Sequence, residues 1–564
     1  MKKILIFLLA AIAMYSCDDF LNTENLTKKD TGNYPENMTE MQALLTGVYA
    51  SARLMEIDVE AKSSYLISQI LSDDCFMGGG PDDALHIANK MNTNDPEFFI
   101  TTWTNAYESL FRANSLLNST EKFTGWSNNN ERGYIEGQTH FLRGYTLYYL
   151  AKMFGTAPMP LTTEPLNLPR ASADEMFGQI GADLKTAITM LPSTPRAAER
   201  GRATKWAAQA LMARAFLFYT GYYNKESIAL PDGGTITKAN VIAWLQDCET
   251  NSGHNLYTAG NDINAGNGFC NLWPYSNTFT KEDGYGFSQK LDLNWAGETG
   301  NNIETVFAWQ NRAQSGWGNG LESYPNRLVH YMSPRNYELP LTYPYGTGWG
   351  FAPVNPQLWK EWGATEPNDP RRKGSIADVS DPDEMSAYPW GADKQQHESG
   401  YLQKKYIAIN SKNGDVIENY AREMYGPTVQ TDYQINNTQD FVVIRFADVL
   451  LMLAELTQDA APLNQVRSRA GLDGVAYSDK NLQNERRWEF AFEGLRYYDL
   501  LRWHIAAEKI GAKNGVALKF DSKDGVADLG DIAKRITDTG GFMPIPVSQV
   551  QLSNGVLVQT PGWK

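Results

Sequence analysis

Residues 484–503, NERRWEFAFEGLRYYDLLRW, carry the most specific pattern in this chain. Their apolar side chains recur at steps of three and four residues, which is the spacing of one face of an α-helix. These positions are Trp488, Ala491, Phe492, Leu495 and Tyr498. Side chains three residues apart on a helix are neighbours, so Glu493 would pair with Arg496, and Asp499 with Arg502. The pattern predicts an ion-paired core helix over 482–503.

The amino-acid sequence of this run resembles the C-terminal signature of the SusD/RagB family of glycan-binding outer-membrane lipoproteins. Other segments resemble the same family in the same order. They are FGTAPMPL (154–161), ATKWAAQALMARAFLFYT (203–220), RFADVLLMLAEL (445–456), LNQVRSRAGL (463–472) and QTPGWK (559–564). The resemblance spans nearly the whole chain. It implies a mostly α, SusD-like fold, in which tetratricopeptide-like helical pairs form a scaffold beside a large irregular, loop-rich region.

The composition excludes some classes of partner. The chain has 564 residues, a net charge of -15 and no Lys/Arg run beyond its N-terminus. This charge argues against nucleic-acid binding and against adhesion to anionic lipid, since both need a basic patch. With 15 Trp and 29 Tyr, the surface suits neutral polar ligands.

The N-terminus has the pattern of a lipoprotein signal. Lys2 and Lys3 precede an apolar run, residues 4–14, that is shorter than the roughly 20 residues of a membrane span. We expect a signal peptide over 1–16 and acylation of Cys17, which would anchor the protein at the cell surface of the outer membrane. Asp18-Asp19 resembles the export tag of surface lipoproteins. The alternative is an ordinary secretory signal with a chance cysteine.

After a lipidated tether, residues 17–37, we expect a single SusD-like domain over 38–564. Helical periodicity predicts a scaffold at about 38–250 and 441–510. The helical segments are 41–49 with Thr39 as N-cap, 103–114, 135–149, 176–191, 203–219, 442–456 and 463–469. Between about 251 and 440, Gly, Asn, Pro, Trp and Tyr crowd together and the periodicity is lost. A loop region of this length is usually functional.

Three cysteines remain after Cys17: Cys75, Cys248 and Cys270. An odd number cannot form a complete disulfide framework, and the chain has no CxxC motif. We expect small buried side chains, with one bridge at most. No metal site and no cofactor is predicted.

The irregular region is rich in aromatic rings and amides. The apolar face of a sugar ring packs on an indole or phenol ring, and its hydroxyls need amide or carboxylate partners. We therefore predict a glycan-binding surface here, and Trp295, Trp309 and Trp317 are preferred because Asn, Gln or Gly flanks each. Further candidates are Trp273, Tyr345 and Trp349. The alternative is that these rings form the core of the loop region.

A second candidate is the acidic, glycine-rich loop SDDCFMGGGPDD, residues 72–83, with His86 beyond it. Three glycines let backbone approach a ligand closely, and carboxylates accept hydrogen bonds from hydroxyls. The resemblance adds weight, because a loop of the first helical pairs contributes to the SusD glycan pocket. The candidates are Asp73, Asp74, Met77, Asp82, Asp83 and His86. Helix capping and a calcium site are the alternatives.

Catalytic patterns are largely missing. The chain has no H-E-x-x-H, no G-x-S-x-G and no P-loop, so we predict a protein without enzymatic activity. The resemblance implies that it captures an oligo- or polysaccharide and delivers it to a SusC-like TonB-dependent transporter. Two alternatives remain open: a surface glycoside hydrolase with a carboxylate pair, and a tetratricopeptide-type adaptor that binds peptides or proteins.

Overall fold

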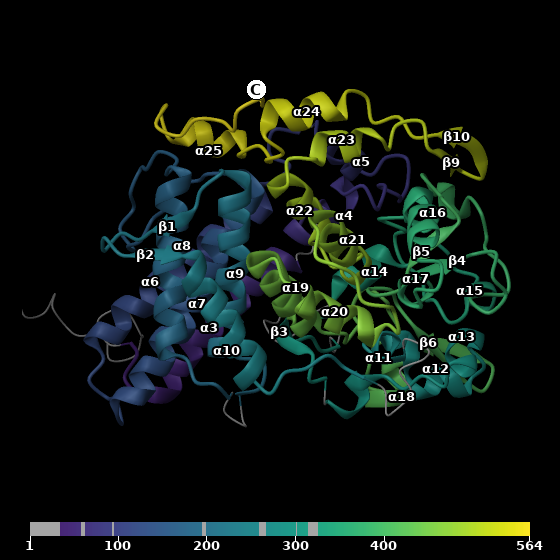
Figure 1. Ribbon diagram of the computed structural model, residues 1–564, viewed down its shortest axis with the longest axis horizontal. Helices are drawn as coiled ribbons and strands as arrows, with labels where there is room; N and C mark the ends of the chain where they lie inside the picture. Colours follow the sequence, from purple (N-terminus) through teal and green to yellow (C-terminus); the bar gives the residue numbers. More distant parts are fainter. Residues whose placement is uncertain are drawn as a thin grey trace, which may run out of the picture.

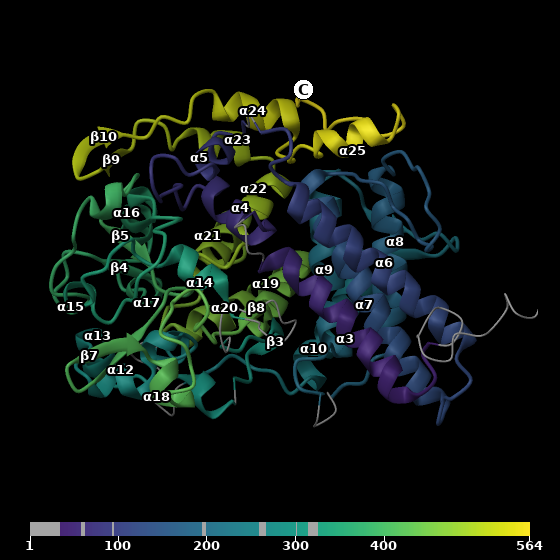
Figure 2. The ribbon, with the colours of Figure 1, turned by 180° about the vertical axis from the view of Figure 1, so that it is seen from behind.

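The computed structural model describes residues 34–57, 62–92, 95–194, 199–258, 267–300, 302–313 and 325–563. The predicted signal peptide, Cys17, most of the tether and Trp317 lie outside these ranges. Figures 1 and 2 show three parts: long helices on one side, short elements on the other, and C-terminal helices between and above them.

Long helices form the first part, and each packs on the next in chain order. They are α3 (Met38–Glu56), α6 (Ile100–Lys122), α7 (Asn129–Phe154), α8 (Ala173–Met190), α9 (Lys205–Tyr222) and α10 (Lys238–Asn251). Short elements join this part: α4 (Ser64–Leu71), α5 (Leu85–Asn89), β1 (Ser227–Ala229) and β2 (Thr235–Thr237). The mostly helical fold that we expected is confirmed.

Local sequence sets the ends of these helices. The Ser172 hydroxyl accepts from Glu175 N while the Glu175 carboxylate accepts from Ser172 N, a reciprocal cap at the start of α8. Gly155, with φ +77°, ends α7. The expected cap at Thr39 is wrong, because the Asn37 side chain accepts from Glu40 N and α3 begins two residues earlier than we expected.

The chain returns to the scaffold after the irregular region. Its elements are β8 (Phe441–Arg445), α19 (Phe446–Thr457), α20 (Ala460–Arg469), α21 (Asp479–Glu489), α22 (Arg496–Arg502), α23 (Ala506–Gly511), β9 (Ala517–Phe520), β10 (Lys523–Val526), α24 (Ile532–Thr539) and α25 (Val547–Leu552). Helix α19 packs on α9 and α10, so the N- and C-terminal helices share one core. The helix predicted over 442–456 is wrong in its first four residues, which belong to strand β8.

The single helix predicted over 482–503 is also wrong. Helix α21 ends at Glu489, and α22 begins at Arg496. Between them Phe492 and Gly494 have φ of +66° and +78°, which no α-helix allows. A Cβ atom on Gly494 would lie 2.7 Å from the Tyr65 ring, so the turn also depends on close packing. Because the helix breaks here, Glu493 lies in the core and does not pair with Arg496 as we expected.

Short helices and strands of two-stranded sheets occur throughout the described part of residues 251–440. The helical elements are α11 (Asn267–Cys270), η2 (Pro274–Ser276), α12 (Thr278–Glu282), α13 (Gly286–Lys290), η3 (Ala296–Thr299), α14 (Arg327–Met332), α15 (Leu339–Thr342), α16 (Pro356–Thr365), α17 (Arg371–Ser375), η4 (Ala392–Lys394) and α18 (Ala421–Tyr425). The strands are β3 (Thr305–Trp309), β4 (Ile376–Asp378), β5 (Tyr401–Gln403), β6 (Asn410–Asn413) and β7 (Val416–Asn419). Antiparallel pairing of β3 with β8 attaches this region to the scaffold.

Buried ion pairs reinforce that attachment, and the 484–503 run supplies their centre. Arg445 contacts the carboxylates of Glu489 and Glu493, each at 2.8 Å, and also that of Glu304. Arg371, from the irregular region, lies 2.9 Å from Glu489 and 2.8 Å from Asp369. Removing one partner would leave an uncompensated buried charge, so these contacts hold the irregular region in one position.

Candidate functional site

Three predicted aromatic residues lie in the core. Trp309 is 3% exposed, and the Tyr145 ring meets its face edge-on at 5.4 Å. Trp273 and Tyr345 are equally enclosed, and the Tyr345 hydroxyl lies 3.0 Å from that of Tyr285. These rings are the apolar anchors of a region with little regular structure. They present no open face for a sugar to stack on.

Two other predicted rings are half-buried. Trp349 stacks on Tyr331 with centroids 4.7 Å apart and planes at 28°, so one face is covered. Trp295 donates from Nε1 to Leu272 O at 3.3 Å, and Tyr420 meets its ring edge-on at 5.6 Å. Only Trp295 among these five rings is both accessible and beside a large cavity.

Asp73 and Asp74 are buried in ion pairs. Arg496 contacts Asp73 at 2.8 Å, and Arg487 contacts Asp74 at 2.7 Å. Burial alone would raise the pKa of Asp73, but the charges of Arg487 and Arg496 outweigh it and lower that pKa. These carboxylates are buried and connect the loop to the signature run.

The glycine-rich loop that follows packs against another backbone. Phe76 N donates to Pro353 O at 2.9 Å. Gly79 N donates to Gly350 O at 3.1 Å. A Cβ atom on Gly78 would lie 1.9 Å from Gly350 O, so this approach of two backbones requires glycine. The glycines therefore serve backbone packing. Met77 is fully buried here, and its carbonyl accepts from His397 Nδ1.

The tip of this loop reaches the surface. Asp82 is exposed, and the half-buried Asp83 accepts from Gly80 N. His86 Nε2 lies 3.0 Å from Gly80 O. Burial lowers the pKa of His86, so its imidazole is neutral at pH 7. The tip thus offers carboxylates and a neutral imidazole on a turn held by its own hydrogen bonds.

Arg335 and its ion-pair partner Asp393 connect this tip to two segments that each carry an exposed ring. Arg335 lies 3.2 Å from where a Cβ atom on Gly80 would stand, and it pairs with Asp393 at 2.6 Å. Tyr337, two residues after Arg335, is 76% exposed, and Trp390, three residues before Asp393, is 38% exposed. We call this surface the Gly80 face. It comprises Gly80, Asp82, Asp83, His86, Arg335, Tyr337, Trp390 and Asp393.

Sequence reasoning missed Tyr337, Trp390 and Arg335. Asn336 precedes Tyr337, and Trp390 lies between Pro389 and Gly391, so both rings belong to turns. A search for aromatic residues inside turn sequences would have found them.

A much larger cavity lies elsewhere, between the long helices and the irregular region. It has a volume of about 510 Å³. We call it the Trp295 hollow. Its lining includes Arg200, Arg202, Thr204, His254, Trp273, Trp295, Asn302, Gln310, Asn311, Tyr425, Gln439 and Asp440.

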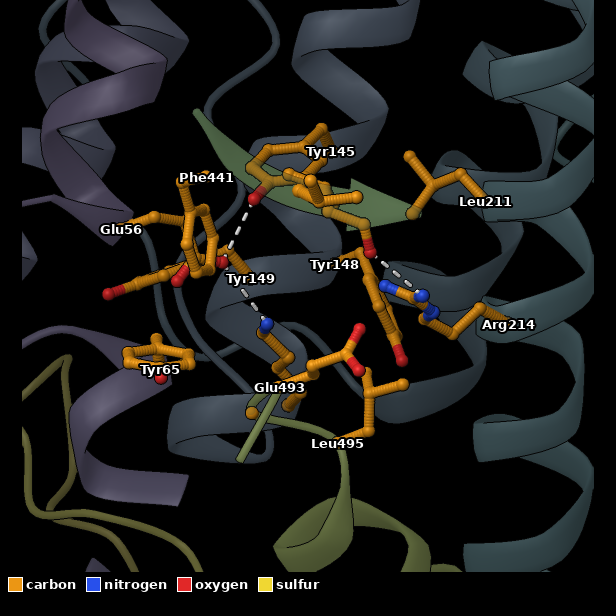
Figure 3. Close-up of a pocket in the computed structure, with 14 residues that line it drawn as sticks. Glu56, Tyr65, Tyr145, Tyr148, Tyr149, Leu211, Arg214, Phe441, Glu493 and Leu495 are labelled. Carbon is orange, nitrogen blue, oxygen red and sulfur yellow. Dashed lines mark hydrogen bonds and ion pairs between the residues drawn. The ribbon is translucent and has the colours of Figure 1, made fainter. Parts of the chain in front are cut away.

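A small cavity also lies inside the scaffold, lined in part by β8 (Figure 3). It measures about 30 Å³, which is room for a water molecule or two. Tyr145 donates to Glu56 at 2.9 Å, and Lys152 Nζ lies 3.3 Å from the same carboxylate. Burial lowers the pKa of Lys152. The size of this cavity suits a structural water and excludes a sugar.

Metal binding finds no support in the described ranges, since they contain no group of three or more His, Cys, Asp or Glu placed to hold an ion. Cys75, Cys248 and Cys270 are buried and free. Among the helices that the structure describes, none is long and apolar enough to cross a membrane.

Comparison with known proteins identifies the family. The SusD family model matches residues 247–563, more than half of the chain. This chain belongs to the SusD family. A second model, described as starch-binding associating with outer membrane, matches residues 19–217 of this SusD-family protein. The resemblance stated from the 484–503 run is thereby confirmed, as is its implication of a non-catalytic surface glycan-binding protein.

Relatives of this SusD-family chain match it along nearly its full length. SusD-like proteins P25 and P2 of Formosa agariphila are each 21% identical, over 90% and 91% of this chain and 91% and 92% of their own. A laminarin binding SusD-like protein has a TM-score of 0.70 at 24% identity, with 94% of this chain and 100% of that one covered. Surface glycan-binding protein A from Bacteroides thetaiotaomicron, in complex with laminarihexaose, has a TM-score of 0.68 at 19% identity, covering 93% and 99%. The mostly helical SusD-like fold is confirmed.

Proposed function

We propose that this protein captures an oligo- or polysaccharide on the Gly80 face and delivers it to a SusC-like TonB-dependent transporter. The observation that carries the proposal is the pair of exposed rings, Tyr337 and Trp390, on segments that Arg335 and its ion pair with Asp393 join to the loop of Asp82 and Asp83.

The chemistry of this face matches that of a sugar. The C–H face of a pyranose ring buries apolar area against a phenol or indole without needing a charge. Its hydroxyls then need polar partners, since a buried hydroxyl without one is costly. Asp82 and Asp83 accept from hydroxyls, and the neutral His86 imidazole, which donates from Nε2 to Gly80 O, accepts through Nδ1. The aromatic rings supply apolar area for the C–H face of the sugar, and the short polar side chains supply hydrogen-bond partners for its hydroxyls.

Neutral glucans are the first ligands to test. Relatives are described as binding laminarin or laminarihexaose, and the N-terminal family model is described as starch-binding. The net charge of -15 also disfavours polyanionic glycans. Individual stacking contacts are weak, so a chain that engages several sites would bind more tightly than a short oligosaccharide.

The test is affinity electrophoresis against laminarin and starch, followed by titration calorimetry. We expect Tyr337→Ala and Trp390→Ala each to weaken binding by a stacking-sized amount, about 0.5–1.5 kcal/mol. Phe111→Ala is a matched control, because Phe111 is 55% exposed on α6, away from this face. Binding that is unchanged in both ring variants would refute the role of the Gly80 face. Release of reducing sugar by the protein would instead favour the hydrolase alternative.

Anchoring and partner are parts of the same proposal. The signal pattern before Cys17 and the match to a family model described as associating with the outer membrane support a lipid anchor at the cell surface. Metabolic labelling with a fatty acid should mark the protein and not its Cys17→Ala variant. Affinity purification from solubilised outer membranes should recover a TonB-dependent barrel. Recovery without any barrel would contradict the delivery step.

A further inference from the structure

One short segment, residues 395–398, joins the glycine-rich loop to the C-terminal hairpin β9–β10. Gln396 N donates to Gly79 O in the loop at 2.9 Å. Two residues later, Glu398 N donates to Lys519 O of β9 at 2.9 Å, and Lys519 N donates to Glu398 O at 2.8 Å. These backbone bonds give the Glu398 side chain a defined position relative to the glycine-rich loop.

The turn that carries Trp390 is hydrogen-bonded to the Glu398 carboxylate. Gly391 N donates to both oxygens of this carboxylate, at 3.0 and 2.9 Å. The Tyr388 hydroxyl and the backbone N–H of Ser522 donate to the same group. Glu398 is only 3% exposed, so protein donors take the place of water around it. Two of those donors, Tyr388 and Gly391, enclose Trp390 in the sequence, so the carboxylate holds the turn from both ends.

Further contacts orient the exposed Trp390 ring. Lys519 Nζ lies 5.4 Å from the centroid of the indole, and the Tyr388 ring meets it edge-on at 4.9 Å. A Cβ atom on Gly391, whose φ is +74°, would lie 2.8 Å from the backbone that joins β9 to β10. The turn therefore packs directly on the hairpin, where only glycine fits. The orientation of the ring depends on the turn keeping its contacts with Glu398 and the hairpin.

Protonation would change how Glu398 holds the turn. Burial raises the pKa of this carboxyl above its ordinary value, although its hydrogen bonds and the charge of Lys519 act in the opposite direction. The titratable groups that face it are Tyr388 and Lys519, and Lys519 also pairs with Asp524 at 2.7 Å. A carboxylate accepts through both oxygens, whereas a protonated carboxyl has one O–H that donates. Acid therefore weakens the contact with the turn.

We propose that Glu398 is a positioning residue of the Gly80 face, which holds the Trp390 ring in the orientation that stacks on a sugar. This inference rests on the proposed function, because Trp390 is one of the two rings that carry it. Glu398 is buried and acts through the ring. Its segment is also bonded to the glycine-rich loop, so it fixes the spacing between the ring and the carboxylates of Asp82 and Asp83. A surface fixed before the ligand arrives loses less conformational entropy on binding.

The first test is a double-mutant cycle, measured by titration calorimetry with laminarin. Glu398→Ala should weaken binding by about two- to tenfold, as Trp390→Ala does, and it should add no further loss in the Trp390→Ala background. Glu398→Gln keeps one acceptor oxygen for the turn, so its loss should be smaller. Glu282→Gln is the matched control, because it removes an exposed carboxylate from α12.

The second test needs no ligand. In fluorine NMR of protein labelled with 5-fluorotryptophan, the resonance missing from the Trp390→Ala spectrum belongs to Trp390. In the wild type this resonance should shift as the pH falls through the pKa of Glu398, which lies above the ordinary glutamate value. The shift should be missing in Glu398→Gln. A carboxylate that only stabilises the fold would leave the ring resonance where it is.

The outcomes separate this inference from the proposed function. If Trp390→Ala weakens binding and Glu398→Ala does not, the positioning role is overturned and the Gly80 face stands. If Trp390→Ala leaves the affinity unchanged, the part of this ring in the proposed function is overturned, and the positioning role with it. A Trp390 resonance that responds neither to pH nor to Glu398→Gln overturns the positioning role whatever the glycan result. If Glu398→Ala does not fold, Glu398→Gln decides: a loss that disappears in the Trp390→Ala background supports the role, and unchanged affinity overturns it.

Discussion

Arg496 donates two parallel hydrogen bonds to the Asp73 carboxylate, from Nε to Oδ1 and from NH2 to Oδ2, and both are 2.8 Å long. The two residues lie 423 positions apart in the chain. Arg496 begins α22, and Asp73 begins the loop that leads to the Gly80 face. A bidentate pair fixes orientation as well as distance, so the C-terminal signature run positions a surface loop from the N-terminal part.

Replacing Asp73 by Ala should lower the free energy of unfolding by about 3–5 kcal/mol, because it leaves Arg496 buried and uncompensated. Chemical denaturation measures this change. Asp82→Ala is the matched control. Asp82 is exposed at the tip of the same loop, so the expected change stays within about 0.5 kcal/mol. Equal effects of the two variants would mean that the Arg496 contact contributes little to stability.

The free energy of unfolding should fall at acidic pH because the Asp448 carboxylate becomes protonated. Burial would raise the pKa of this carboxyl, but the charges of Arg214 and Arg486 outweigh burial and lower the pKa to about 2. The unfolded value is near 3.9, so the stabilisation is fully present above about pH 4 and is lost as pH falls toward 2. It amounts to roughly 2–3 kcal/mol.

Urea unfolding at a series of pH values measures this loss. The Asp448→Asn variant should be less stable at neutral pH, and its stability should fall less steeply between about pH 4 and 2. Parallel pH profiles for the wild type and the variant would contradict the assignment.

Gly79→Ala should destabilise the loop for two reasons. Gly79 has φ of +80°, and a Cβ atom there would lie 2.3 Å from Asp83 Oδ2 and 2.6 Å from the Phe351 ring. We expect a loss of about 2–4 kcal/mol in unfolding free energy, together with weaker glycan binding at the Gly80 face. Thermal unfolding and calorimetry report the two effects.

The Gly233→Ala variant is a control that introduces backbone strain without a steric clash of the added Cβ atom. Gly233 has φ of +84° but no atom within 4 Å of the added Cβ, so only the backbone strain of about 1–2 kcal/mol applies. If Gly79→Ala were no worse than Gly233→Ala, close packing of this loop would not matter.

The Trp309→Ala variant should lower the stability of the fold and leave glycan affinity unchanged. The ring is 3% exposed and contacts Tyr49, Tyr145 and Phe307 edge-on, so its removal creates a cavity and lowers the unfolding free energy by about 3–5 kcal/mol. Glycan affinity of the folded variant should equal that of the wild type. A loss of glycan affinity with unchanged unfolding free energy would instead indicate that Trp309 contacts the glycan.

Much of the scaffold could be predicted because helices are local. The apolar spacing in 135–149 and 176–191 located α7 and α8. The errors came where distant contacts override spacing. The 482–503 pattern continues through residues 490–495, yet the chain turns there so that Glu493 can meet Arg445 and Lys405. No local signal distinguishes that turn from a helix.

Sequence by itself determined the family, the helical frame and the wealth of aromatic rings and carboxylates, because these depend on residue order and composition. Only the tertiary structure decided which of those groups meet solvent. Trp309 and Asp73 are buried, while Tyr337 and Asp82 are exposed. The physical reason is that the exposure of a ring or a carboxylate depends on residues hundreds of positions away, and the same side chain is equally suited to a core contact and to a ligand contact.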